Sequence, residues 1–142
     1  MMEKISKLEN EIRELINHPR KKHFLMLDAT QWYQLCSSMD VIGDTELAIN
    51  SYLQNINKPA QYGELYILLY GILQVLFVQQ DAVKHLAESL GVEYKPSKAL
   101  NEIRDIRNDS VGHPTKREFG KGRDRDKSYN FITRMSMTRN GF

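Results

Sequence analysis

The chain has 142 residues and a formal net charge of +2, with 41% apolar and 27% charged residues. This length suits one domain with a single hydrophobic core, and the composition excludes a disordered chain. The first seven residues lack the basic-then-apolar order of a secretory signal, and one cysteine, Cys36, cannot form an internal disulfide. We therefore expect a cytoplasmic protein without a disulfide framework.

The first predicted helix lies between Ile5 and Ile16, where apolar residues recur every three to four positions with Glu and Lys between them. It should end at His18-Pro19. Its narrow apolar seam could pack on the domain or against a partner helix, and packing on the domain is favoured. The basic residues 20–23 are expected to form a link to the next helix.

A second helical region follows, with Asp28 or Thr30 as its N-cap. Gly43 interrupts the apolar pattern, and Asp44 or Thr45 could cap a continuation. Two helices or one kinked helix would both satisfy this pattern.

Residues 61–90 are apolar around nearly the whole circumference of a helix, which predicts burial nearly all round. The strongly apolar run from Leu65 to Val78 covers about 14 residues, whereas a membrane span needs about 20. We therefore exclude a membrane span and expect a central core helix. Its outer face should contact other helices and also form the seam of a symmetric dimer.

Ser97 is expected to cap a further helix that carries Arg104 and Arg107, three residues apart, on one face. Pro114 disfavours helical geometry at the residue before it and has no N–H to donate. The helix should therefore stop just before this point and leave His113 on a turn.

The C-terminal tail is basic. Residues 114–142 hold eight Lys and Arg against three Asp and Glu, a net charge of +5, so the rest of the chain carries −3. This asymmetry favours an anionic partner such as nucleic acid. Residues 119–127 are expected to form a loop. In residues 129–138 the side chains alternate with a period of two, which predicts a strand. The chain either continues past Phe142 into a returning strand, which is favoured, or pairs this strand with another chain.

These patterns predict an all-α fold, an antiparallel bundle of four to five helices, with a short C-terminal extended or β segment. We assign residues 1–115 to the helical domain. Residues 116–142 form a basic loop and an extended tail, possibly truncated.

The chemically most informative residues are Arg107, Asn108 and His113, which the helix end should bring close together. A guanidinium keeps its charge and can hold a phosphate, and an imidazole that titrates near neutrality can move a proton. In the competing interpretation, Arg107 pairs with Asp105 or Glu102, and His113 only bonds the last helix carbonyls.

This segment resembles the motif of the HEPN family, a mostly helical fold common in bacterial toxins, antiviral defence proteins and RNA-processing enzymes. The motif is an arginine, roughly four to six residues and then a histidine. Here five residues separate Arg107 from His113, and Asn108 is the polar residue that ribonuclease members often place after the arginine. The resemblance covers roughly residues 1–115, and the tail from Glu118 onward does not match.

The resemblance implies a homodimer whose two motifs face one cleft and cut RNA without a metal, by attack of the ribose 2′-hydroxyl on the neighbouring phosphate. It implies a role in toxin–antitoxin systems or phage defence, with an antitoxin or inhibitory protein as a possible partner. The expected catalytic residues are Arg107, His113 and Asn108, and the expected RNA-binding residues are Arg104, Lys116 and Arg117. The alternative is a non-catalytic HEPN module that binds RNA or nucleotide, or that mediates dimerisation and assembly.

Other candidate sites are weaker. Asp81 and His85 share a helix face at a spacing that suits metal binding, but two ligands are too few for a site. Cys36 lies among apolar neighbours and is expected to be a small core residue. Because a glycine-rich phosphate-binding sequence is also lacking, we expect neither a metal nor a cofactor.

Overall fold

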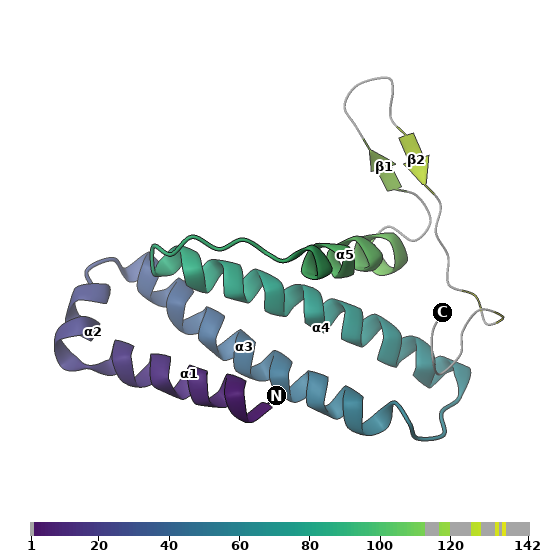
Figure 1. The fold of residues 1–142 in the computed structure, drawn as a ribbon, viewed down its shortest axis with the longest axis horizontal. Helices are drawn as coiled ribbons and strands as arrows, with labels where there is room; N and C mark the ends of the chain where they lie inside the picture. Colours follow the sequence, from purple (N-terminus) through teal and green to yellow (C-terminus); the bar gives the residue numbers. More distant parts are fainter. Residues whose placement is uncertain (1, 113–116, 120–125, 129–132, 134, 136–142) are drawn as a thin grey trace. The chain divides into compact units, whose positions relative to one another are not determined.

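The computed structural model describes residues 2–112, 117–119 and 126–128, together with Thr133 and Met135 (Figure 1). A π-helical turn, Asn108–Gly112, continues the last helix of the first range. That range holds five α-helices: α1 Met2–Asn17, α2 Pro19–Leu25, α3 Ala29–Asn55, α4 Tyr62–Ser89 and α5 Lys98–Arg107. The all-α prediction is therefore confirmed for residues 2–112.

Local chemistry sets several of the helix ends as predicted. The Asp28 Oδ1 atom accepts hydrogen bonds from two of the next backbone N–H groups, at 2.9 and 3.1 Å, so Asp28 caps α3. Ser97 Oγ accepts from the Leu100 N–H at 3.4 Å and caps α5. Gly91 follows α4 with a φ of +66°, a left-handed conformation that glycine adopts without a steric cost.

One predicted interruption is wrong, and the structure decides between the two alternatives at the other. Residues 20–23 belong to α2 rather than to a link, because Pro19 occupies the start of the helix, where its fixed φ is favourable and its missing N–H costs nothing. Of the two alternatives predicted around Gly43, the structure has a single helix, α3. The Thr45 hydroxyl does not cap a new helix, since it donates to backbone carbonyls three and four residues earlier, at 3.0 and 2.7 Å.

The chain divides into two compact units, residues 1–48 with 78–95 and residues 49–77 with 96–142. Both α3 and α4 begin in one unit and end in the other. In the first unit, side chains from α1, α3 and α4 form one apolar core. This core consists of Ile16, Leu35, Met39, Ile42, Ala82 and Leu86. Cys36 packs against it, in agreement with its predicted role.

The apolar surface of α4 is only partly covered within one chain. Leu73 is buried, whereas Ile67 is 73% exposed and Tyr62 is 55% exposed. Burial nearly all round is therefore not reached within the single chain, and the dimer seam that was expected to cover part of α4 stays a prediction. Among the described residues α4 also has the length and composition of a membrane span, with a mean hydropathy of 1.4 over 18 residues, although core helices of soluble proteins can share both properties.

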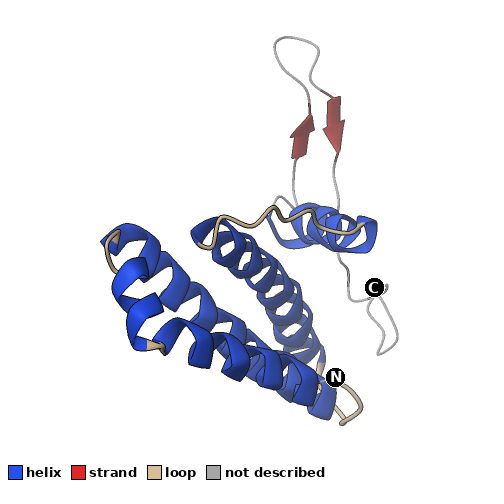
Figure 2. Cartoon of the chain, turned by 60° about the vertical axis from the view of Figure 1, so that its left-hand side comes forward, coloured by secondary structure: helices blue, strands red, loops and turns tan. Residues whose placement is uncertain are grey.

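Two short strands, β1 Arg117–Phe119 and β2 Asp126–Ser128, pair antiparallel, with Arg117 opposite Ser128 (Figure 2). Residues 119–127 were expected to form a loop, and the ends of that segment are instead strand. The strand predicted at 129–138 lies mostly outside the described residues. Of that segment Thr133 and Met135 are described, and neither lies in a strand.

Candidate functional site

The guanidinium of Arg107, the last residue of α5, is held by hydrogen bonds in the second unit. Its Nε and Nη2 atoms donate to the Oε1 atom of Gln74 on α4, at 3.1 and 2.8 Å. Its Nη1 atom donates to the Oδ1 atom of Asn108 at 3.1 Å. A guanidinium carries five N–H groups in one plane, so two acceptors on different elements fix the orientation of that plane.

An aromatic ring supports the same guanidinium. The Cζ atom of Arg107 lies 4.3 Å from the ring centroid of Phe77, one helical turn after Gln74 on α4. The Cζ atom of Arg104 lies 4.2 Å from the same centroid. Each cation–π contact contributes roughly 0.5–2 kcal/mol, depending on exposure. One ring therefore contacts two guanidinium groups.

The π turn brings the backbone of Gly112 against the Arg107 side chain. A Cβ atom added at Gly112 would lie 2.8 Å from the Nη1 atom of Arg107 and 3.6 Å from the Oδ1 atom of Asn108. A distance of 2.8 Å is too short for a real Cβ contact, so any larger residue here would displace the guanidinium. Glycine is therefore the residue that this close approach requires.

The structure brings together three of the six predicted site residues: Arg104, Arg107 and Asn108. His113 and Lys116 lie outside the described residues. Arg117 begins β1, of which the backbone is described. In the competing interpretation, Arg107 pairs with Asp105 or Glu102. The Glu102 carboxylate lies 3.7 Å from the Nζ atom of Lys98 and forms its ion pair there.

Sequence reasoning missed Gln74 and Phe77. Gln74 is the polar residue that interrupts the apolar run of α4, and a half-buried amide at such a position needs a partner. That signal could have indicated Gln74 as a contact of the motif. Phe77 carries no such signal, because an aromatic residue in an apolar helix is ordinarily read as core.

The arrangement suits recognition of a phosphate. Arginine binds phosphate oxygens through parallel N–H groups, and a fixed guanidinium plane lowers the entropy lost when it does so. Three donors of Arg107 hold it in place, and each terminal nitrogen carries a second N–H. Among the residues that the structure describes, no three His, Cys, Asp or Glu side chains gather as a metal site requires.

No protein-family model, no curated protein and no solved structure matches this chain. The resemblance to the HEPN family therefore depends on the motif residues and on their place at the end of a late helix that follows a long apolar helix.

Proposed function

We propose that this chain is a metal-independent endoribonuclease of the HEPN type, acting in toxin–antitoxin systems or phage defence. The observation that supports the proposal best is the Arg107 guanidinium, oriented by Gln74 and Asn108 and supported by Phe77. A charge that is already oriented before substrate arrives stabilises a transition state without a further reorganisation cost.

In the proposed mechanism, Arg107 and His113 carry out the cleavage. Arg107 binds the oxygens of the scissile phosphate and offsets the charge that builds as the 2′-hydroxyl attacks. His113 directly follows Gly112 in the chain, the residue whose added Cβ would meet the Arg107 guanidinium. In the proposal its imidazole transfers a proton from the 2′-hydroxyl or to the leaving oxygen.

The remaining predicted residues have supporting roles. Asn108 orients Arg107 rather than the ribose, because its Oδ1 atom accepts the Nη1 bond. Arg104, next to Arg107 on the Phe77 ring, and the tail residues Lys116 and Arg117 hold the RNA backbone. Since the nucleophile is the 2′-hydroxyl, DNA is not a substrate. The proposal also includes an antiparallel bundle that dimerises, with the two motifs facing one cleft.

The test is incubation of the purified full chain with end-labelled single-stranded RNA in excess chelator. We expect cleavage that leaves 2′,3′-cyclic phosphate ends, and a loss of roughly 100-fold or more in Arg107→Ala and in His113→Ala. Arg13→Ala is the matched control, because Arg13 pairs with Glu9 and Asp40 on α1 and α3, in the other unit. It should cleave as the unsubstituted chain does.

Three results would contradict the proposal: RNA that stays intact, cleavage that survives both substitutions, or equal cleavage of an RNA and the same strand with 2′-deoxyribose at the cut site. The dimer is tested separately by mixing Arg107→Ala protomers with His113→Ala protomers. If the sites are composite, the mixture regains part of the activity, and independent sites would regain none.

The second candidate is a non-catalytic HEPN module that mediates assembly or binds RNA without cutting it. The observation that favours it is the exposed apolar surface of α4, where Ile67 is 73% exposed. This candidate predicts a dimer in light scattering, RNA binding in a gel shift and no cleavage. Ile67→Glu should then yield monomers, whereas Lys84→Glu, an exposed substitution on the same helix, should not.

A further inference from the structure

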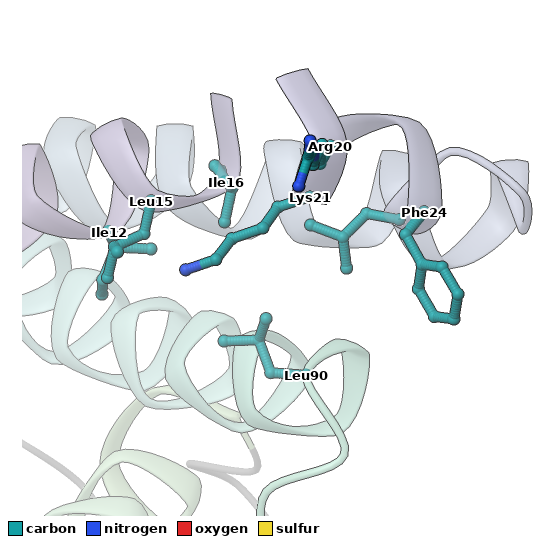
Figure 3. Close-up of a pocket in the computed structure, with 8 residues that line it drawn as sticks. Ile12, Leu15, Ile16, Arg20, Lys21, Phe24 and Leu90 are labelled. Carbon is teal, nitrogen blue, oxygen red and sulfur yellow. The ribbon is translucent and has the colours of Figure 1, made fainter. Parts of the chain in front are cut away.

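A concave surface lies in the first unit and takes no part in the proposed ribonuclease site. It is a groove of about 530 Å³ between α1, α2 and the residue that follows α4. Volumes of roughly 300–1,000 Å³ are typical of small-molecule sites. The groove is lined by Ile12, Leu15, Ile16, Arg20, Lys21, Phe24, Leu25 and Leu90 (Figure 3).

The walls of this groove are apolar and uncovered. Phe24 is 74% exposed and Leu15 is 55% exposed, although both are large apolar side chains. The core residue Ile16 also lines the groove. Leu90, on the opposite wall, is 39% exposed. Large apolar side chains that stay in contact with water around a concavity are typical of a surface that binds an apolar group.

The charged lining is entirely cationic. The helix α2 contains Arg20, Lys21 and Lys22 and no carboxylate. Lys22 lies over the ring of Trp32, with its Nζ atom 5.7 Å from the ring centroid. The Lys21 side chain extends along the groove, so its amine lies toward the Ile12 end, whereas Phe24 lies at the other end (Figure 3). Among the described residues, no carboxylate forms an ion pair with Arg20 or Lys21.

We propose that this groove binds a free aliphatic carboxylate, with the alkyl chain against Leu15, Phe24 and Leu90 and the carboxylate at Lys21. The apolar walls exclude water from the alkyl chain, and the cation stabilises the anionic head. A concave surface of this size suits a single chain. Binding of the protein to a bilayer surface, by contrast, would need apolar residues that protrude rather than line a concavity.

The first test compares three ligands of one chain length on the unsubstituted full chain by isothermal titration calorimetry, below their micelle concentrations. Dodecanoate should bind, dodecanol should bind more weakly, and dodecyltrimethylammonium should bind at least about tenfold more weakly than dodecanoate. No heat with dodecanoate, or equal affinity for the three head groups, overturns the proposal. So does binding to vesicles of an anionic phospholipid without binding of dodecanoate.

The second test uses substitutions at exposed positions, which leave the core intact. Lys21→Met removes the cation but keeps a similar stem, and Leu15→Glu adds a negative charge to the wall. Each should weaken dodecanoate binding by roughly tenfold. The matched controls are Lys4→Met on α1 and Leu47→Glu on α3, both at exposed residues outside the groove. Circular dichroism verifies that each variant is folded. The proposal is overturned if Lys21→Met and Leu15→Glu are both folded and bind dodecanoate as tightly as the controls do.

Discussion

A single oxygen of Gln74 accepts two hydrogen bonds from Arg107, which lies 33 positions further along the chain. The amide belongs to α4 and the guanidinium to the end of α5, so this contact ties two elements of the second unit together. It also fixes the plane of the guanidinium. The same pair of bonds therefore has a consequence for stability and a separate one for the proposed cleavage.

Gln74→Leu removes the acceptor but retains the size of the side chain. We expect the free energy of unfolding to fall by about 1–2 kcal/mol, because hydrogen bonds to a charged group are lost from a half-buried position. Gln74→Glu keeps the acceptor and adds a negative charge beside Arg107. Its stability should stay within about 1 kcal/mol of the original, while RNA cleavage falls roughly tenfold or more, because the carboxylate competes with phosphate.

Urea denaturation measures the first effect for both variants, and the labelled-RNA assay measures the second. Gln54→Leu is the control, since Gln54 is exposed on α3 in the same unit. It should change neither quantity. Equal stability of the Gln74→Leu and Gln54→Leu proteins would mean that the Gln74 contact contributes nothing to folding.

Gly112→Ala tests the close approach of the backbone to Arg107. The new Cβ would lie 2.8 Å from the Nη1 atom, so the guanidinium must move. Because the obstructing atom ends a flexible side chain, we expect a stability loss of at most about 1 kcal/mol. The cleavage rate, by contrast, should fall toward that of Arg107→Ala, because a shift of about 1 Å is costly for a positioned charge.

Gly71→Ala is the matched control for this substitution. A Cβ at Gly71, within α4, meets no other atom within 4 Å. The free energy of unfolding should therefore rise by about 0.5–1 kcal/mol, as alanine is the better helix former, and cleavage should not change. If both glycine variants cleave equally well, the contact with Arg107 has no functional importance.

The features that the sequence predicts correctly depend on residues close together in the chain. Asp28 and Ser97 bond N–H groups two or three positions away, so the local pattern contains the whole interaction. At Gly43 the sequence left two helices or one kinked helix open, and α3 is one helix. The cost of one glycine in a helix is only about 1 kcal/mol, and the flanking core residues Met39 and Ile42 outweigh it.

In the candidate site, too, the sequence predicts only contacts between residues that are close together in the chain. The pattern around the end of α5 predicts the proximity of Arg107 and Asn108, which are adjacent. It cannot predict the contact with Gln74 or the shared ring of Phe77, because both partners come from a helix 30 or more positions earlier. The available signal was Gln74, a polar residue within an apolar run, but nothing local indicated that Arg107 is its partner.

Leu35→Ala tests the core of the first unit. Leu35 is 1% exposed and lies at the centre of the apolar cluster between α1, α3 and α4. We expect the free energy of unfolding to fall by about 2–5 kcal/mol, from the lost transfer energy and the cavity left behind. Thermal denaturation followed by far-ultraviolet circular dichroism measures the change. Leu47→Ala, at a position 70% exposed on the same helix, should shift stability by less than about 0.5 kcal/mol, and equal effects would contradict this core.

The pH dependence of Cys36 follows from its surroundings. Burial raises the pKa of the Cys36 thiol above its ordinary value, and the nearby Asp40 carboxylate raises it further. Only the thiolate reacts with iodoacetamide, so the midpoint of the alkylation rate against pH should lie above that of the same protein unfolded in urea. Asp40→Asn should lower this midpoint only in part, because burial is the larger cause.

The raised pKa of Cys36 also determines whether the protein gains or loses stability as the pH rises. Between the unfolded and the folded pKa of Cys36, the native state keeps a proton that the unfolded chain has lost. This contribution to stability is fully present below the unfolded value, about 8.5, and it is lost as the pH rises through the folded pKa. Cys36→Ala should therefore lose less stability than the unsubstituted chain between pH 8 and 10, in urea titrations at each pH. An alkylation midpoint at or below that of the unfolded chain would show that the thiol is solvated rather than packed against the core.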